Sequence, residues 1–146
     1  MKIYLDTSVY NRPFDDQTQP RIWLETLALA LILQLVEAGE AALVNSSALE
    51  FENSQNPFSL RQDWMARCLE QATIHQRVGK SIYERAEALE TYGFKAIDAL
   101  HVACAESAGV DYFLTCDDRL LKKQKHITIS SMNPLDFIQR VMGEQP

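Results

Sequence analysis

Short apolar runs alternate with longer apolar or amphipathic runs along the chain. The short runs, which are typical of strands, occupy residues 2–6, 41–45, 73–78, 112–115 and 127–129. The longer runs predict helices at residues 21–38, 46–53, 59–71, 81–91, 94–108 and 117–123, with a last helix opening at Pro134. Strands that alternate with helices predict a three-layer α/β/α fold, in which a central parallel sheet of four to five strands is flanked by helices.

Several residues set the expected ends of these elements. Ser46 is expected to cap the helix that follows it, and Gly109 to end the helix before it. The segment 7–20 is polar and contains two prolines, so we expect irregular structure there. Two further pairs have the spacing of capping boxes: Ser59 with Gln62, and Ser81 with Glu84.

The length of 146 residues suits one domain spanning 1–146, and a hydrophobic content of 47% is enough for a buried core. The three cysteines are far apart and show no CxxC spacing. This argues against a disulfide framework or a thiolate zinc site and favours a reducing compartment such as the cytoplasm. Residues 22–36 are the most hydrophobic stretch, but they include Glu25 and are shorter than the roughly 20 residues of a membrane span. We interpret them as a buried helix and expect no membrane insertion.

The net charge of −6 bears on possible ligands. It argues against a protein that binds nucleic acid tightly and passively, because neutralising phosphates favours basic surfaces. It argues less strongly against an enzyme whose site is itself built of carboxylates that hold cations.

Acidic residues stand at the ends of two predicted strands and inside one apolar helix. Asp6 closes the first strand and Asp117 follows the fourth, and ligand sites in parallel α/β sheets lie beyond the carboxyl ends of the strands. Asp98 lies in a helix of small and apolar residues, so it needs a partner if it is buried. Simpler interpretations remain open: Asp6 could merely cap the following turn, and Asp98 could face solvent. His101 lies one turn after Asp98 and faces the same side of the helix. A histidine in such a position is more often a core residue, or a residue that hydrogen-bonds to a metal ligand, than a metal ligand itself.

Two segments offer a choice between neighbouring acids. After the fourth strand, one of Asp117 and Asp118 should cap the next helix, which leaves the other to face the site. On the helix at 46–53, Glu50 and Glu52 are two residues apart and point to roughly opposite faces, so at most one should reach the site.

Carboxylates gathered at strand ends repel one another and must bind cations or take up protons. Sites made only of oxygen ligands suit Mg²⁺, Mn²⁺ or Ca²⁺ rather than zinc. The sequence contains no HExxH, GxSxG, P-loop or GxGxxG motif, which excludes the commonest zinc, nucleophilic and nucleotide-binding sites.

With these residues in hand, the chain resembles the PIN domain family, which is named for the N-terminal domain of PilT-like proteins. The first strand followed by Asp6, Thr7 and Ser8 resembles the opening motif of the family. Ser46, with Glu52 six residues later, resembles the family's Ser-to-Glu spacing.

Two further motifs complete the resemblance. Asp98 in the context IDALHVACA resembles the third acid of the family, and Thr115 with Asp117 resembles its closing Thr-x-Asp motif. The motifs span residues 2–118 in the order that the family has them.

The resemblance implies an activity and a set of catalytic residues that also bind Mg²⁺ or Mn²⁺: Asp6, Glu52, Asp98 and Asp117. The implied reaction is metal-dependent hydrolysis of phosphodiester bonds by a ribonuclease. The family's Ser-to-Glu spacing favours Glu52 as the glutamate of this set, with Glu50 as the alternative. Similarity to VapC-type toxins further implies a cognate antitoxin and a homodimer.

Other side chains are expected to support this site. Those that could orient a carboxylate or a water, or replace a ligand, are Thr7, Ser8, Thr115, Asp118 and His101. Asn11 and Arg12 could contact a phosphate of the substrate, since a guanidinium can grip phosphate oxygens in a bidentate way.

Rival functions were weighed against the same residues. A haloacid-dehalogenase-like phosphatase needs a second aspartate two residues after the first, and this chain has Ser8 there. A response-regulator receiver domain needs an aspartate that closes a central strand, and the strand at 41–45 ends without one. The remaining alternative is a PIN-fold module that binds RNA or protein without cutting. The gathered acids argue against it, because a pure binder has little reason to collect repelling carboxylates.

Overall fold

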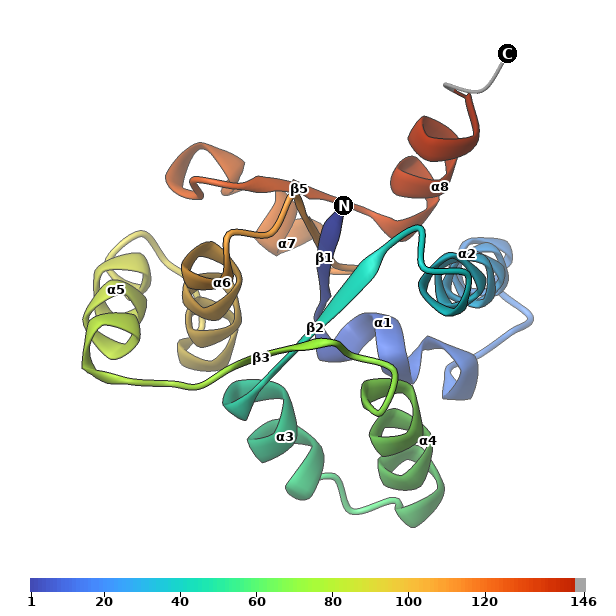
Figure 1. Cartoon of the computed structure of the whole chain (residues 1–146), viewed down its shortest axis with the longest axis horizontal. Coiled ribbons are helices and arrows are strands. Elements are labelled where there is room, and N and C mark those ends of the chain that lie inside the picture. The colour runs from blue at the N-terminus through green and yellow to red at the C-terminus, as the bar shows by residue number, and fades with distance from the viewer. Residues whose placement is uncertain (144–146) are drawn as a thin grey trace.

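The computed structural model describes residues 1–143, and the strands of this part form one parallel sheet (Figure 1). The sheet has the order β3-β2-β1-β4-β5, and each neighbouring pair is parallel. The strands are β1 (Lys2–Leu5), β2 (Ala42–Ser46), β3 (Ile74–Gln76), β4 (Tyr112–Leu114) and β5 (Ser130–Met132). The predicted α/β fold with a central parallel sheet is confirmed.

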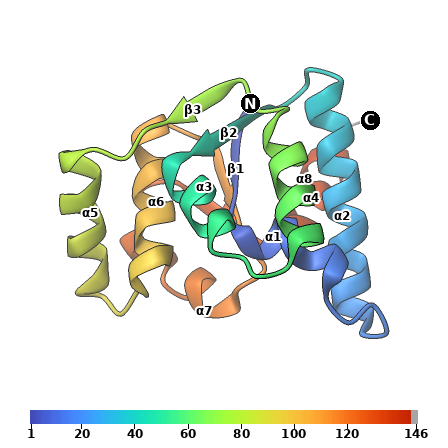
Figure 2. The same ribbon diagram turned by 90° about the horizontal axis from the view of Figure 1, so that it is seen from below.

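Helices cover the sheet on both faces. Figures 1 and 2 show α5 and α6 on one side of the strands and α1, α2, α4 and α8 on the other. The helices are α1 (Thr7–Asn11), α2 (Pro20–Glu37), α3 (Ser47–Ser54), α4 (Ser59–Leu69), α5 (Lys80–Glu90), α6 (Ala96–Ala108), α7 (Asp118–Leu121) and α8 (Pro134–Gly143), with short 3₁₀ helices η1 (Arg12–Phe14) and η2 (Gln124–His126).

The order of the strands reverses beside β1. The chain runs outwards from β1 to β2 and β3, and then returns to place β4 on the other side of β1. The backbone N–H of Asp6 donates to the carbonyl of Leu114 at 3.1 Å, so the ends of β1 and β4 lie side by side. Parallel sheets bind ligands at such a reversal, beyond the carboxyl ends of the strands.

The core is built around the central strand. Ile3, Tyr4 and Leu5 are fully buried because β1 is covered on both faces, which explains its continuous apolar run. The cysteines of the chain are all buried and unpaired, as the absence of any paired spacing predicted.

The segment after Asp6 is more regular than we predicted. Residues 7–14 form α1 and η1 instead of irregular structure. The side chain of Asp6 caps α1 by accepting from the backbone N–H of Ser8 at 3.0 Å, and Pro13 lies in the first turn of η1, where its missing N–H costs nothing.

The predictions of both capping boxes were wrong, although the helices that they were expected to open, α4 and α5, are present. The residues at the N-cap positions are Phe58 and Gly79, and neither makes a side-chain capping bond. Ser59 and Ser81 lie inside the first turns instead. By contrast Ser46 caps α3 as predicted, since its hydroxyl accepts from the N–H of Leu49 at 3.1 Å.

The last strand lies three residues later than predicted. Residues 124–126 form η2, and the side chain of Gln124 binds the carbonyl of Ile129 and the N–H of Ser131. These bonds place β5 at 130–132 rather than 127–129. Pro134 opens α8, as predicted.

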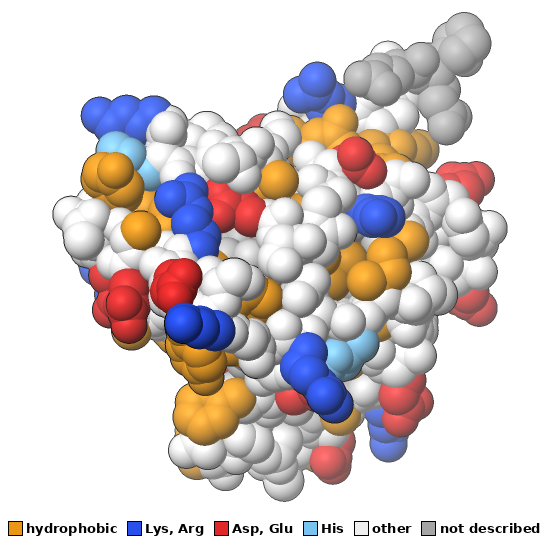
Figure 3. Space-filling view, turned by 60° about the vertical axis from the view of Figure 1, so that its left-hand side comes forward, with side chains coloured by type: hydrophobic (Ala, Val, Ile, Leu, Met, Phe, Trp, Pro, Cys, Tyr) orange, Lys and Arg blue, Asp and Glu red, His pale blue; other side chains and the backbone are white. Residues whose placement is uncertain are grey.

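Helix α2 is only partly buried, which corrects our interpretation of residues 22–36. Its inner face packs on the core, but its outer face keeps Trp23, Leu24, Leu27 and Leu31 between 40% and 51% exposed. Figure 3 shows that hydrophobic side chains also remain at the surface on the α5 side of the molecule. Within residues 1–143, no helix is both long and apolar enough to cross a membrane.

Candidate active site

A pocket of about 190 Å³ lies at the carboxyl ends of the central strands. Its lining comes from four separate parts of the chain: the β1–α1 junction, α3, α6 and the segment after β4. The lining residues are Asp6, Thr7, Ser8, Asn11, Glu52, Asp98, His101 and Asp117. The fold therefore brings together the four acids that the sequence singled out.

Asp6 stands at the junction of β1 and α1. One of its oxygens, Oδ1, accepts from both the N–H and the hydroxyl of Ser8. Burial raises the pKa of Asp6 from 3.8 to about 6, against the lowering effect of the hydroxyls of Ser8 and Thr115, and the charge of Asp98 adds to the rise. Asp6 thus caps α1 and also lines the pocket, so its capping role does not remove it from the candidate site.

Glu52 reaches the pocket from α3. Its Oε1 accepts a hydrogen bond from the hydroxyl of Thr7 and lies 2.8 Å from His101 Nε2. Burial raises the pKa of Glu52, but the hydrogen bond and charge of His101 and the hydroxyl of Thr7 outweigh it, and the net pKa lies below the ordinary value.

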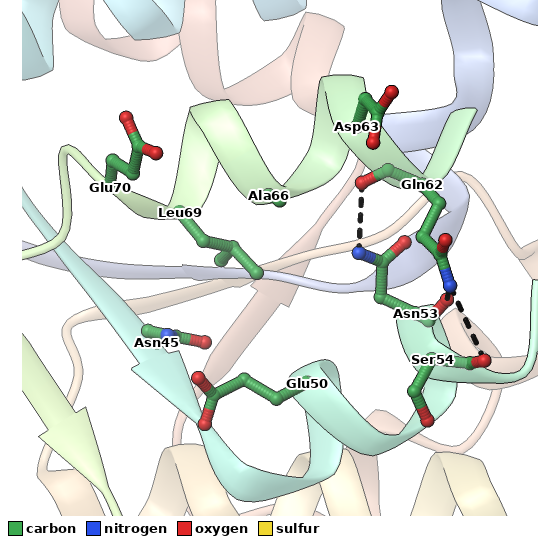
Figure 4. Close-up of a pocket in the computed structure, with 9 residues that line it drawn as sticks. All are labelled: Asn45, Glu50, Asn53, Ser54, Gln62, Asp63, Ala66, Leu69 and Glu70. Atoms are coloured by element: carbon green, nitrogen blue, oxygen red, sulfur yellow. Dashed lines mark hydrogen bonds between the residues drawn. The ribbon is translucent and has the colours of Figure 1, made fainter. Parts of the chain in front are cut away.

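Glu50 points elsewhere, as the helical spacing predicted for one of the two glutamates. Its Oε1 lies 2.7 Å from His75 Nε2, at the surface. It lines a different pocket of about 550 Å³ between α3 and α4, where Figure 4 shows it facing the side chains of Asn45 and Leu69. The structure therefore brings Glu52, and not Glu50, to the other three acids.

Asp98 lies in the first turn of α6 and faces the pocket. Burial raises its pKa, and the charges of Asp117 and Glu52 raise it further. His101, one turn later, is 1% exposed. Its Nδ1 lies 2.7 Å from the hydroxyl of Tyr4, and its Nε2 faces Glu52, so both ring nitrogens are engaged by protein groups.

Asp117 both caps α7 and lines the pocket. Its Oδ1 accepts from the N–H of Arg119 at 2.9 Å, and its own N–H donates to the hydroxyl of Thr115 at 3.0 Å. We predicted that one of Asp117 and Asp118 would cap the helix and that the other would face the site. This prediction was wrong, because Asp117 does both. Asp118 instead binds Arg21 of α2 through two contacts of 2.7 Å and does not line the pocket.

Thr115 and Ser8 join the two strand ends beneath the acids. Their hydroxyl oxygens are 3.4 Å apart, and the hydroxyl of Ser8 accepts from the N–H of Cys116 at 3.0 Å. Neither residue needs to contact a ligand to fix the relative position of Asp6 and Asp117.

Of the two residues considered for phosphate contact, only Asn11 lines the pocket. The guanidinium of Arg12 lies 2.9 Å from the fully buried Glu25 and 3.0 Å from Asp15. A buried carboxylate without its cation is costly, so these contacts hold Arg12 in a structural role. Arg12 is therefore not a candidate for phosphate contact in this arrangement.

Sequence reasoning missed Tyr4, which contacts His101 from outside the pocket, and Arg21, which holds Asp118 away from it. A tyrosine within an apolar strand looks like an ordinary core residue, and the only signal is that its hydroxyl needs a partner when buried. Arg21 lies on a helix remote in sequence from Asp118, and no local pattern joins the two.

The chemistry of the pocket suits a divalent cation. The donors are carboxylate oxygens, as Mg²⁺ and Mn²⁺ prefer. Burial first, and then the charges of neighbouring acids, raise the pKa values of Asp6 and Asp98, and a bound cation would favour the charged form of both. As the side chains stand in residues 1–143, no three His, Cys, Asp or Glu groups are close enough to hold one ion. The chemistry fits, and the carboxylates would have to close around the ion.

Solved structures that share this fold include the following three. FitAcB from Neisseria gonorrhoeae is 21% identical with a TM-score of 0.51, over 90% of this chain and 97% of that chain. VapC20 from Mycobacterium tuberculosis is 12% identical with a TM-score of 0.57, over 83% and 94%. VapBC2 from Rickettsia felis is 14% identical with a TM-score of 0.56, over 91% and 100%. At these identities the likeness concerns the fold alone.

Sequence comparison identifies the family. No curated protein matches the chain as a relative. The family model described as PIN domain, however, matches residues 3–126, which include all four acids of the pocket. This chain is therefore a member of the PIN domain family.

Proposed function

We propose that this protein is a metal-dependent ribonuclease that hydrolyses phosphodiester bonds in RNA and acts as the toxin of a toxin–antitoxin pair. The observation that carries the proposal is the meeting of Asp6, Glu52, Asp98 and Asp117 from separate segments in one pocket. Membership of the PIN family supports it. So does the similar fold of VapC20, which is described as a toxin that cleaves the sarcin–ricin loop.

The four carboxylates would hold Mg²⁺ or Mn²⁺, which supplies a more acidic attacking water and offsets the charge of the phosphate. Other side chains of the protein hold these carboxylates in place. Ser8 fixes Asp6, while Thr7 and His101 fix Glu52. The amide of Asn11, in the same pocket, is suited to donate to a phosphate oxygen.

Purified protein is expected to cut RNA when Mn²⁺ or Mg²⁺ is added and to leave it intact with EDTA. The variant Asp98→Asn should lose the cleavage, because it removes a charge that the cation needs. Gel analysis of a single-stranded and a structured RNA measures both results. Wild-type protein that cuts neither RNA with Mn²⁺, or an Asp98→Asn variant that cuts equally well, contradicts the nuclease proposal.

The rival function is a PIN-fold module that binds RNA or protein without cutting. It is favoured by one observation, the open arrangement in which no three ligands yet converge within residues 1–143. Metal titration separates the two functions. A metal site should show saturable Mn²⁺ binding that stabilises the fold by about 2.7 kcal/mol at a hundredfold excess over Kd, and a silent module should show neither.

The partners and the compartment are part of the proposal. An antitoxin protein is the expected partner, as in VapC-type toxins, and the unpaired cysteines favour the cytoplasm. A second copy of the chain is the expected occupant of an apolar groove of about 590 Å³ between α3, α5 and α6. Phe51 and Tyr83 line this groove yet stay 61% and 56% exposed, so each copy offers both the groove and the aromatic rings to fill it.

A Tyr83→Asp variant should therefore be monomeric where the wild type is a dimer. The new carboxylate would lie in the groove beside Glu87 and Glu90, and burying it against a second copy would be costly. Size-exclusion chromatography with light scattering measures the mass. Leu60→Asp is the control, because Leu60 is 75% exposed and lies outside the groove. Wild-type protein with the mass of one chain contradicts the dimer.

A further inference from the structure

A continuous set of hydrogen bonds leads from Glu52 into the core of the protein. Oε1 of Glu52 lies 2.8 Å from Nε2 of His101, and Nδ1 of the same ring lies 2.7 Å from the hydroxyl of Tyr4. The hydroxyl of Tyr4 lies 2.7 Å from that of Ser46. Tyr4, His101 and Ser46 are each at most 1% exposed, so no solvent competes for these bonds.

The chemistry of the groups fixes the direction of the bonds. A carboxylate can only accept, so Nε2 of His101 carries the proton that faces Glu52. In a neutral ring Nδ1 is then bare, and the hydroxyl of Tyr4 must donate to it. The oxygen of Tyr4 is left to accept from Ser46, whose own oxygen accepts from the N–H of Leu49.

This direction determines which atom of Glu52 is left for a ligand. Both His101 and Thr7 donate to Oε1. With Oε1 held from two sides, the carboxylate is fixed and Oε2 is the oxygen available for a cation or substrate. A ring with its proton on Nδ1 would turn a lone pair towards Glu52 and repel it.

We propose that Tyr4 is a positioning residue for the active site: its hydroxyl holds His101 in the Nε2-protonated form, and His101 in turn holds Glu52. The proposal rests on the proposed function, because it assigns Glu52 to metal and substrate. Tyr4 itself touches neither. It acts through the buried ring between it and the pocket, as partners behind metal ligands do in other proteins.

The hydroxyl of Tyr4 can be separated from the packing of its ring. The ring stacks on Phe113 with centroids 5.5 Å apart and meets His101 edge-on at 5.8 Å, and phenylalanine would keep both contacts. Tyr10 offers a matched control. It is also fully buried, but its hydroxyl has no hydrogen-bond partner among the described residues.

The test compares Tyr4→Phe with Tyr10→Phe in the full-length protein. Long-range ¹H–¹⁵N spectra of the histidine rings report which nitrogen carries the proton. We expect His101 to be protonated on Nε2 alone in wild type and Tyr10→Phe, and to populate both forms in Tyr4→Phe. Mn²⁺ affinity and kcat/KM should fall by about 10- to 100-fold in Tyr4→Phe and stay unchanged in Tyr10→Phe.

The outcomes separate this proposal from the proposed function. Tyr4→Phe with an unchanged His101 ring, whatever its activity, overturns the positioning role, and so does wild-type His101 protonated on Nδ1. If wild type cuts no RNA but Tyr4→Phe changes both the ring and the Mn²⁺ affinity, the positioning role stands and the nuclease function fails.

Discussion

Replacing Asp6 with asparagine is expected to reduce RNA cleavage by roughly 100-fold and, at the same time, to stabilise the metal-free protein at neutral pH. Asp6 belongs to the pocket of acids, and losing its charge removes part of the cation site. A bound cation can stabilise the charge of the transition state by several kcal/mol. Losing about 3 kcal/mol of this stabilisation would lower the rate of cleavage by roughly 100-fold. The shape of the residue is kept, and the amide oxygen can still accept from the N–H of Ser8.

The gain in stability follows from the pKa of Asp6. Burial raises this pKa from 3.8 to about 6 in the folded chain, so the folded state binds a proton more tightly than the unfolded state. The free energy of unfolding therefore falls as the pH rises from about 4 to about 6, by about 3 kcal/mol in all. Asparagine carries no charge and escapes this loss.

Urea denaturation of both proteins in EDTA, at pH 4 and at pH 7.5, measures the effect. The variant should equal the wild type at pH 4 and exceed it at pH 7.5, and saturating Mn²⁺ should narrow the gap by stabilising the wild type. Asp63→Asn is the control, because Asp63 lies on the exposed side of α4, outside the pocket. A gap that is the same at both pH values would show that burial of the Asp6 charge is not its cause.

The fold was predictable because its signals are local and repeated. The three central strands, β1, β2 and β4, are short and mostly apolar runs, whereas the edge strands β3 and β5 carry mostly polar residues and gave weaker signals. The positions of Asp6, Asp98 and Asp117 follow from strand ends and from one acidic residue in an apolar helix. The order of the strands was not predictable in this way. The reversal that places β4 beside β1 depends on contacts between residues more than a hundred positions apart, such as Asp6 with Leu114.

Two of the incorrect site predictions share a physical cause. Arg12 was assigned to phosphate because its chemistry allows it, but the buried Glu25 takes its charge. Asp118 was the alternative to Asp117, but it is paired with Arg21 instead. In each case a partner on α2, 13 residues away for Arg12 and 97 for Asp118, determined which of several suitable groups was left for the pocket, and no short sequence motif carries that information.

The choice between Glu50 and Glu52 is the same kind of question, and it leads to the second large effect. Glu52→Gln is expected to reduce cleavage by roughly 100-fold, because it removes a carboxylate from the cation site. Glu50→Gln should leave the rate within about twofold, since it breaks only an exposed pair with His75, of a kind worth about 0–1 kcal/mol in stability.

The stability of Glu52→Gln should change in the opposite sense to that of Asp6→Asn. His101 and Thr7 outweigh burial and hold the pKa of Glu52 below its ordinary value, so its charge stabilises the fold above the unfolded pKa, and this contribution is lost as the pH falls through the folded pKa. Glutamine should therefore destabilise the metal-free protein at pH 7.5. Cleavage rates and urea denaturation of the two glutamine variants measure both effects. Equal losses of activity in Glu50→Gln and Glu52→Gln would mean that the pocket described here is not where RNA is cut.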